Sequence, residues 1–169
     1  LDAVMAQCDV RTRVIYLASP GNPTGWMIPR DQAERLLAFA RENNIAILSD
    51  EVYHRTVYGM NAAFSFLEIA QPGDPVFVAN SFSKAWAMPG WRLGWIVYPE
   101  GHTDSFEKLI QFNTSGAPAF LQHAAIVALD QGEDFVKSFA ARCSAGRDVV
   151  KTRLGRMKRV RNIPSEGAF

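Results

Sequence analysis

Four short stretches of the chain consist almost entirely of hydrophobic residues, without the alternation of polar and apolar positions that marks a half-exposed strand. They are residues 14–17, 45–50, 76–81 and 94–99. Runs of this kind, rich in β-branched and aromatic residues, predict strands that are covered on both faces inside a sheet. Between the first two, residues 30–44 carry alanine and leucine at helical spacing, so the pattern predicts a strand–helix–strand unit and a layered α/β fold.

After Pro118 the pattern changes from strands to helices. Residues 120–131 and 133–157 repeat their apolar positions with the period of an α-helix. Residues 158–163, which follow, are predicted to form a short strand. The chain is therefore expected to begin as a sheet with helices and to end in helices with one further strand.

Composition and charge remove several classes of function. With 48% hydrophobic and 21% charged residues the chain resembles a globular protein, and its formal net charge of +1 gives no overall field that would attract nucleic acid or an anionic membrane. The basic stretch 151–161 fits one solvated helix face better than a phosphate-binding patch. No apolar run reaches the roughly 20 residues of a membrane span, and the histidines lack the spacing of metal ligands. We therefore expect no nucleic-acid partner, no membrane partner and no metal.

Cysteine usage and the ends of the chain bear on its location and extent. The two cysteines, Cys8 and Cys143, form no CxxC motif, and no secretory leader is present, which predicts free thiols in a reducing cytoplasm. The chain begins with Leu1 instead of methionine and ends on the apolar Phe169 directly after SEGA. We expect it to be a piece of a longer protein.

Polar clusters follow the predicted strands where α/β folds bind ligands, beyond the carboxyl ends of the strands. The loop ASPGNPTG (18–25) leaves Asn22 as the side chain with both donor and acceptor groups. Asp50 ends the next strand, and Tyr53 follows three residues later. Taken singly, the loop also fits a tight turn and Asp50 also fits a helix cap.

The stretch SFSKAWAMPGWRLGW (81–95) adds a lysine between hydroxyl residues and an arginine eight positions later. A plain surface lysine is disfavoured, because the neighbouring tryptophans would cost solubility unless they were buried. The three clusters together supply seven candidate residues for one ligand: Asn22, Asp50, Tyr53, Ser81, Ser83, Lys84 and Arg92. Pyridoxal phosphate has the matching groups: a phosphate for the serines and the arginine, a ring nitrogen for the aspartate, a phenolic oxygen for the tyrosine and the asparagine, and an aldehyde for the lysine.

These motifs resemble those of the pyridoxal-phosphate-dependent aminotransferases of fold type I, class I/II. SPGNPTG, SDEVY and SFSKAWAMPGWRLGW stand in the order of that family. Asn22 lies 28 residues before Asp50, and Lys84 lies eight residues before Arg92, as in the family. The terminal SEGAF resembles the family's GAFY element, so the similarity covers nearly the whole chain.

The resemblance implies that Lys84, Asp50 and Tyr53 are catalytic. The lysine would join the cofactor's aldehyde as a Schiff base and later move a proton, and the aspartate would face the ring nitrogen. The tyrosine would donate a hydrogen bond to the phenolic oxygen. Asn22 would donate to the same oxygen and contact the substrate carboxylate, with a cis bond to Pro23.

The other three residues are implied to hold the cofactor's phosphate. A guanidinium fork suits bidentate phosphate binding, so Arg92 would act there together with the hydroxyls of Ser81 and Ser83. The tryptophans are expected to pack around the site. His54 and Tyr58 are expected to be structural.

The same resemblance predicts the organisation of the protein. It implies a three-layer α/β/α fold with a mostly parallel sheet, residues 1–130 in a large cofactor-binding domain, and residues 131–169 as a connecting helix and the beginning of a small domain. The implied activity is transfer of an amino group between an L-amino acid and a 2-oxo acid, in a cytoplasmic homodimer. The segment alone is expected to be inactive, because other parts of the family's site lie outside it.

Three other interpretations stay open. A pyridoxal-phosphate-dependent lyase or decarboxylase of the same fold would share the cofactor contacts. A transcriptional regulator that senses the cofactor would keep Lys84 and Asp50. A folded interaction module would carry the motifs by coincidence.

Overall fold

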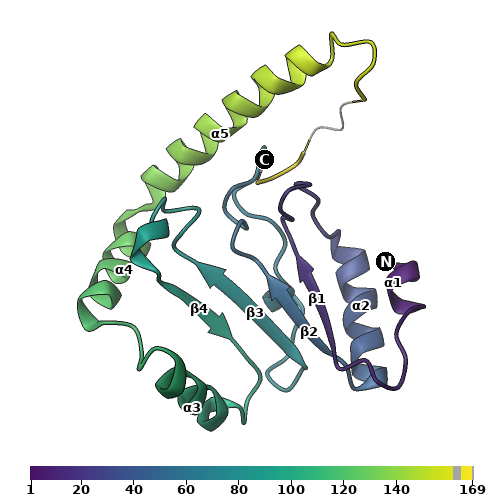
Figure 1. Cartoon of the computed structure of the whole chain (residues 1–169), viewed down its shortest axis with the longest axis vertical. Coiled ribbons are helices and arrows are strands. Elements are labelled where there is room, and N and C mark those ends of the chain that lie inside the picture. Colours follow the sequence, from purple (N-terminus) through teal and green to yellow (C-terminus); the bar gives the residue numbers. More distant parts are fainter. Residues whose placement is uncertain (162–164, 169) are drawn as a thin grey trace.

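The sheet lies at the centre of the molecule. In the computed structural model, which describes residues 1–161 and 165–168, its four strands lie side by side in the order of the chain. They are β1 (Val14–Ala18), β2 (Ala46–Asp50), β3 (Val76–Ser81) and β4 (Gly94–Val97). β1, β2 and β3 are parallel, and β4 runs antiparallel to β3 (Figure 1). The predicted α/β fold with a mostly parallel sheet is confirmed.

The helices follow the predicted order with two added α-helices. The described part contains α1 (Asp2–Met5), α2 (Arg30–Asn43), α3 (Thr103–Asn113), α4 (Ala119–Gln131) and α5 (Glu133–Leu154), and the short 3-10 helices η1 (Phe66–Glu68) and η2 (Pro89–Trp91). The predicted helices over 30–44, 120–131 and 133–157 are confirmed, although α5 ends just before Gly155. The additions are the short α1 before β1, and α3, which lies between β4 and α4.

The strand predicted over residues 158–163 is wrong for residues 158–161, which form a turn followed by chain without regular secondary structure. A strand needs a neighbour to satisfy its backbone groups, and no strand of the described sheet pairs with this stretch. Residues 162 and 163 lie outside the described part.

α2 covers one face of the sheet. Four of its side chains, which lie at helical spacing on one side, are at most 2% exposed: Ala33, Leu36, Leu37 and Ala40. The strand residues in the same cluster are Ile15, Ile47, Val76 and Val78. Full burial of one leucine contributes about 1.5–3 kcal/mol. This contact therefore holds β1, α2 and β2 as one unit, with the loops after both strands at the same edge of the sheet.

The opposite face of the sheet is largely open. The strand register pairs Tyr16 with Leu48 and Leu48 with Phe77, so the three side chains share this face, and Tyr16 is 62% exposed. Cover begins only where the Phe77 ring meets His102 and Phe106 at the start of α3. The prediction that the strands are covered on both faces is wrong for the described residues, because the chain supplies a full helix on the α2 side alone.

A second hydrophobic cluster joins the loop after β3 to α4 and α5. The ring centroids of Phe82 and Trp86 lie 5.0 Å apart, and Trp86 Nε1 donates to the carbonyl oxygen of Ala128 at 2.9 Å. Trp86 is 9% exposed, whereas Trp91 is 44% exposed. The expected packing of the tryptophans is thus confirmed for Trp86 and wrong for Trp91.

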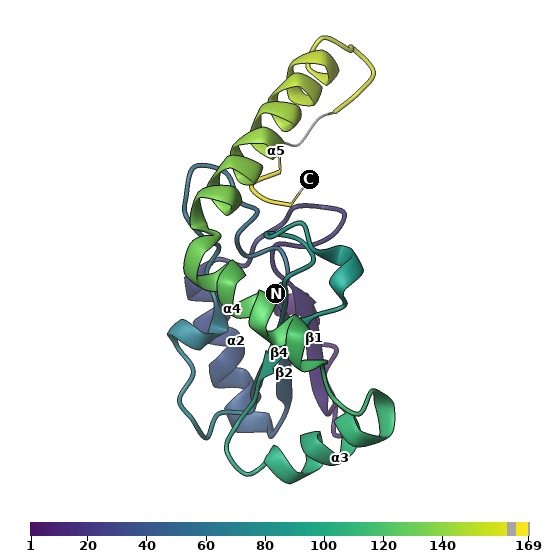
Figure 2. The ribbon, with the colours of Figure 1, turned by 90° about the vertical axis from the view of Figure 1, so that its left-hand side faces the viewer.

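α5 extends away from the sheet, as two perpendicular views show (Figures 1 and 2). After it the chain returns, and Gly167 forms an isolated antiparallel bridge with Val57 in the segment that follows β2. The boundary predicted between residues 130 and 131 lies beside Gly132, where α4 and α5 meet. The division into two domains stays a prediction.

Candidate active site

A cavity of about 480 Å³ opens at the edge of the sheet where β1, β2 and β3 have their carboxyl ends. It is lined by Tyr16, Ala18, Asn22, Asp50, Val52, Tyr53 and Lys84. Four of the seven predicted site residues are in this set: the asparagine, the aspartate, the tyrosine and the lysine. They lie at or just after the carboxyl ends of three different strands, which is where parallel sheets form ligand sites.

Asn22 stands on the loop after β1, and this loop is anchored in the core. The Oγ of Ser19, which is 2% exposed, accepts a hydrogen bond from the Ile28 N–H at 3.0 Å. The Asn22–Pro23 bond is cis, as the resemblance implies. Asn22 Nδ2 lies 3.5 Å from the Tyr53 hydroxyl oxygen. The loop thus places an amide and a phenol next to each other at the cavity.

Asp50 ends β2 with both carboxylate oxygens hydrogen-bonded. Its Oδ1 accepts from the Val52 N–H at 3.2 Å, and its Oδ2 accepts from the Tyr16 hydroxyl at 3.0 Å. The hydrogen bond to Asp50 raises the pKa of the Tyr16 hydroxyl, which therefore stays protonated and donating at neutral pH. A carboxylate with a defined orientation results at the wall of the cavity.

The turn after β2 is held by the buried Glu51 and the partly buried His54. Glu51 is 2% exposed, and its Oε1 accepts from the Ser49 hydroxyl and the Phe66 N–H, both at 3.0 Å. Burial raises the pKa of Glu51. His54 Nδ1 lies 3.1 Å from the Glu51 carbonyl oxygen and 2.9 Å from Asn80 Nδ2, and burial lowers the pKa of His54. These contacts fix the turn that connects the aspartate to the site tyrosine.

Lys84 reaches the cavity from the loop after β3. Its Nζ lies 5.3 Å from the centroid of the Tyr53 ring, which is within the range of a cation–π interaction. In the same loop Ser81 Oγ lies 2.9 Å from Ser83 Oγ and accepts the Ser83 N–H at 3.0 Å. The two hydroxyls therefore form a pair close to the lysine in the chain, and neither serine lines the cavity.

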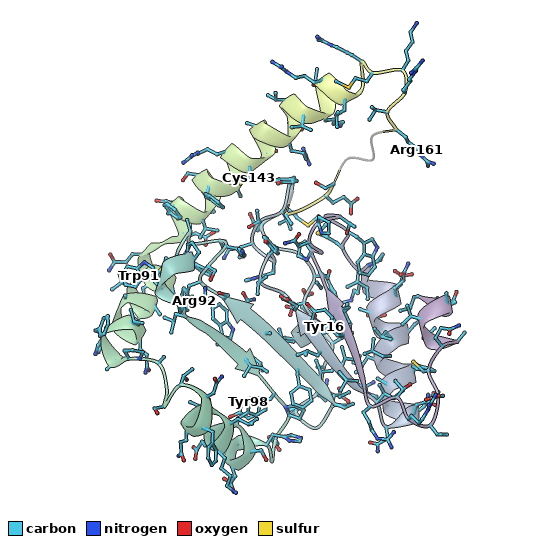
Figure 3. The ribbon with its side chains drawn as sticks, viewed as in Figure 1. Tyr16, Trp91, Arg92, Tyr98, Cys143 and Arg161 are labelled. Atoms are coloured by element: carbon cyan, nitrogen blue, oxygen red, sulfur yellow. The ribbon has the colours of Figure 1, made fainter. Side chains whose placement is uncertain are left out.

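Arg92 is the third predicted site residue that does not line the cavity. It follows η2 with a φ of 52°, and its Nη1 donates to the Pro89 carbonyl oxygen at 2.8 Å. Figure 3 shows it beside Trp91 near the start of β4, whereas Tyr16 lies at the other side of the sheet. This local turn directs the guanidinium to a backbone carbonyl, and a phosphate-binding role for Arg92 stays a prediction.

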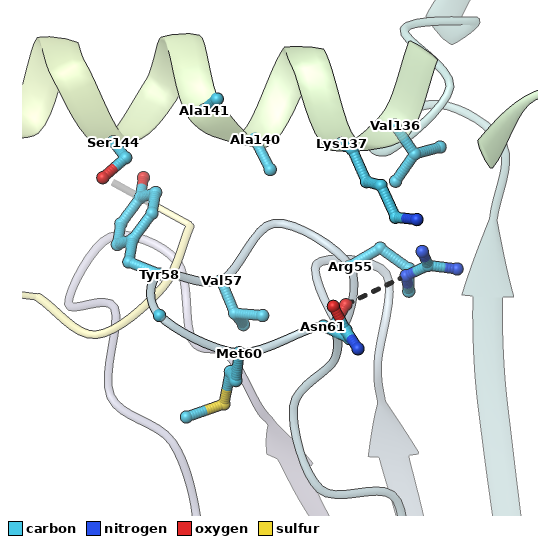
Figure 4. A pocket seen from close by; sticks show the side chains of 11 residues that line it. Arg55, Val57, Tyr58, Met60, Asn61, Val136, Lys137, Ala140, Ala141 and Ser144 are labelled. Atoms are coloured by element: carbon cyan, nitrogen blue, oxygen red, sulfur yellow. Dashed lines mark hydrogen bonds between the residues drawn. The ribbon is translucent and has the colours of Figure 1, made fainter. Parts of the chain in front are cut away.

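A second cavity, of about 370 Å³, lies between α5 and the segment 55–61 (Figure 4). Arg55 Nη2 donates to both carboxylate oxygens of Glu133 at 2.7 Å, and Arg55 Nε donates to the Asn61 carbonyl oxygen at 3.1 Å. Lys137 Nζ lies 3.5 Å from the same carboxylate. Both cations are thus directed to Glu133, and we assign this cavity no ligand.

Within residues 1–161 and 165–168, no group of three or more histidine, cysteine, aspartate or glutamate side chains is arranged to hold a metal ion. No helix in the same part of the chain is both long and apolar enough to cross a bilayer.

Comparison with known proteins decides the family. The family described as "Aminotransferase class I and II" matches residues 1–169. The chain belongs to the class I and II aminotransferases. This membership agrees with the order of the three motifs and with the mostly parallel sheet.

Individual aminotransferases resemble the chain over nearly all of its length. A bifunctional aspartate aminotransferase and glutamate/aspartate-prephenate aminotransferase of Petunia hybrida is 35% identical over 167 residues, which cover 94% of this chain and 34% of that protein. An aspartate aminotransferase of Thermotoga maritima is 33% identical, with 94% of this chain and 41% of that protein covered. The chain therefore spans well under half the length of these relatives.

Solved aminotransferase structures share the fold. The aromatic aminotransferase of Pyrococcus horikoshii superposes with a TM-score of 0.91 at 29% identity, covering 99% of this chain and 45% of that one. The aspartate aminotransferase of Thermotoga maritima gives a TM-score of 0.87 at 32% identity, covering 100% and 44%.

Two residues that shape the candidate site escaped the sequence interpretation: Tyr16, which lines the cavity, and Glu51, which lies beside it. Tyr16 looked like one more hydrophobic strand residue, and Glu51 was only the neighbour of the predicted aspartate. The signal for Tyr16 is the strand register, which pairs Ala18 with Asp50 and so brings residue 16 within diagonal reach of the carboxylate. Glu51 carries no such signal, because its partner Phe66 lies at the start of η1, outside the sheet.

Proposed function

We propose that the complete protein carrying this chain is a pyridoxal-phosphate-dependent aminotransferase that moves an amino group between an L-amino acid and a 2-oxo acid. The observation that carries the proposal is the convergence of Asn22, Asp50, Tyr53 and Lys84 on one cavity. The aminotransferase relatives of the chain support the same activity.

The chemistry of these side chains fits pyridoxal phosphate. A lysine amine is the nucleophile that condenses with an aldehyde. The Asp50 carboxylate suits a protonated ring nitrogen, and a hydrogen bond to a charged partner contributes about 1.5–3 kcal/mol. The Tyr53 hydroxyl and the Asn22 amide, 3.5 Å apart, can both donate to a phenolic oxygen between them. When bound, the cofactor supplies an electron sink for the bond that breaks at the substrate Cα.

Each residue then has a distinct task. Lys84 holds the cofactor covalently and, once its amine is free, carries the proton that leaves the substrate Cα. Asp50 keeps the ring nitrogen protonated, and its two hydrogen bonds keep its carboxylate in place. Tyr53 and Asn22 stabilise negative charge on the phenolic oxygen. We assign the phosphate to Ser81, Ser83 and Arg92, in agreement with the family resemblance.

The remaining properties of the protein follow from the same proposal. Its partners are small amino-acid and 2-oxo-acid substrates, with neither nucleic acid nor membrane involved. We expect a homodimer in the cytoplasm. Residues 1–169 alone are expected not to transaminate, since they span well under half of the relatives they match.

A half-reaction tests the function. The complete gene product, loaded with pyridoxal phosphate, is mixed with single amino acids and no 2-oxo acid. The expected products are one 2-oxo acid per active site and the amine form of the cofactor. Release of ammonia would favour a lyase, release of carbon dioxide a decarboxylase, and binding without turnover a sensor domain. Lys84→Ala should abolish the reaction, whereas Lys108→Ala, on an exposed position of α3, should leave it unchanged.

A further inference from the structure

Tyr16 lines the candidate active site but has no task in the function proposed above. Its hydroxyl donates to Asp50 Oδ2 at 3.0 Å, while the Val52 N–H occupies Asp50 Oδ1 at 3.2 Å. Each oxygen of the carboxylate thus has one donor from the protein. A carboxylate oxygen has two acceptor positions, so Oδ2 can still accept a second hydrogen bond from a ligand.

The contact is built into the register of the sheet. β1 and β2 are parallel, Ala18 pairs with Asp50, and Tyr16 pairs with Leu48. Side chains two residues apart lie on the same face of a strand, so Tyr16 is the diagonal neighbour of Asp50. Diagonal neighbours are about 7–8 Å apart, a gap that a tyrosine spans and a short polar side chain does not.

The hydrogen bond to Asp50 is what orients the Tyr16 hydroxyl within the described residues. The side chain is 62% exposed there, on the open face of the sheet, and its hydroxyl donates to Asp50 Oδ2 at 3.0 Å. The raised pKa of the hydroxyl keeps the proton available for donation at neutral pH.

We propose that Tyr16 is a positioning residue that holds the Asp50 carboxylate in the orientation that meets the ring nitrogen of the cofactor. This inference rests on the proposed function. Without the Tyr16 hydroxyl, the side-chain hydrogen bond that the described residues still give to the Asp50 carboxylate is the one from the Val52 N–H, so the carboxylate is less restrained about its side-chain torsions.

The test compares two tyrosine-to-phenylalanine variants of the complete gene product. Tyr16→Phe removes the hydroxyl beside Asp50, and Tyr98→Phe removes the hydroxyl of a tyrosine whose ring stacks on Phe106 away from the cavity. Both are also made in an Asp50→Asn background. Cofactor affinity is measured by fluorescence quenching of the cofactor-free protein, and the amino-acid half-reaction by single-turnover kinetics.

Tyr16→Phe is expected to weaken cofactor binding and to slow the half-reaction by about 10- to 150-fold each, the effect of one lost hydrogen bond to a charged group. The concentration of amino acid that half-saturates the reaction should change less than about twofold, because the substrate itself is not bound by Asp50. In the Asp50→Asn background the same substitution should change either quantity less than about threefold, since coupled residues are not additive. Tyr98→Phe should match its parent in both backgrounds.

The outcomes separate this inference from the proposed function. A wild-type protein that neither binds the cofactor nor reacts with amino acids overturns both. A wild type that does both, with Tyr16→Phe equal to Tyr98→Phe, overturns the role of Tyr16 alone. Equal losses from Tyr16→Phe with and without the Asp50 carboxylate also overturn it, because the tyrosine would then act independently of Asp50.

Discussion

Replacing Glu51 by alanine is expected to destabilise the fold strongly, although the residue lies beside the active site and not in it. The carboxylate is 2% exposed, and its Oε1 accepts from the Ser49 hydroxyl and the Phe66 N–H, both at 3.0 Å. Ser49 is 0% exposed and Phe66 is 1% exposed, so water cannot replace the lost acceptor. Glu51→Ala therefore leaves two buried donors without a partner.

The magnitude follows from the number of donors that lose their acceptor. Each unsatisfied buried donor costs about 1–3 kcal/mol, so Glu51→Ala should lower the free energy of unfolding by about 2–6 kcal/mol. Glu51→Gln keeps an acceptor oxygen of the same shape and should cost about 1 kcal/mol or less at low pH. The contrast between the two variants isolates the hydrogen bonds from the charge.

The pH dependence has a definite sign. Burial raises the pKa of Glu51 above its ordinary value of 4.5, so the folded state holds this proton more tightly than the unfolded state. Its contribution to stability is fully present below the ordinary pKa and declines as the pH rises through the raised one. Glu51→Gln cannot ionise and should lack this decline, so its stability relative to wild type should improve with rising pH.

Denaturant unfolding of the complete gene product, followed by tryptophan fluorescence between pH 4 and pH 8, measures both effects. Glu107→Ala, at an exposed position of α3, is the matched control and should stay within about 0.5 kcal/mol of wild type. A Glu51→Ala variant within about 1 kcal/mol of wild type would refute the hydrogen-bond argument. A glutamine variant with the same pH slope as wild type would refute the argument from burial.

Three further predictions concern ionisable residues around the site and the core. Burial lowers the pKa of His54, so wild-type stability should fall as the pH drops below 6.5. His54→Gln should flatten this fall, which urea unfolding midpoints from pH 5 to pH 8 measure. Arg55→Lys should weaken the contact that Arg55 Nη2 makes to both carboxylate oxygens of Glu133, and hydrogen exchange in α5 should accelerate; unchanged exchange would contradict a role of this contact in holding α5. The hydrogen bonds from Arg41 lower the pKa of Asp74. This pair therefore stabilises the fold above pH 3.8, and the stabilisation is lost as the pH falls through the lowered pKa. Asp74→Asn should reduce the sensitivity of the fold to acid, and an unaltered midpoint of acid unfolding would contradict the role of this pair.

The sheet could be predicted because its strands are continuous hydrophobic runs. The hydrophobic pattern failed where strand pairing or packing with another segment decides the structure. Residues 158–161 form no strand, because no described strand pairs with them. The open face of β1 has the same hydrophobic character as a buried one, so exposure of Tyr16 could not be inferred from the residues alone. α3 carries apolar residues at helical spacing, such as Phe106 and Ile110, and this periodicity is the signal in the sequence for the helix.

The candidate site could be predicted as far as it depends on strand ends. Asn22, Asp50 and Lys84 each follow a strand of the parallel set, and parallel strands bring their carboxyl ends to one edge. The hydrogen bond from Tyr16 depends on the register between two strands, which the sequence does not specify. The orientation of the Arg92 side chain toward the Pro89 carbonyl oxygen depends on a local turn with a positive φ at Arg92. The residue type alone gives no indication of this turn.

The central claim is that Lys84 carries the cofactor covalently. Borohydride reduction of the loaded, complete protein makes that linkage permanent, and protease digestion with mass spectrometry locates it. The account predicts one pyridoxyl group per chain, on Lys84 in the peptide that contains SFSKAWAM. A label on another lysine, or a protein without label after reduction, would contradict it.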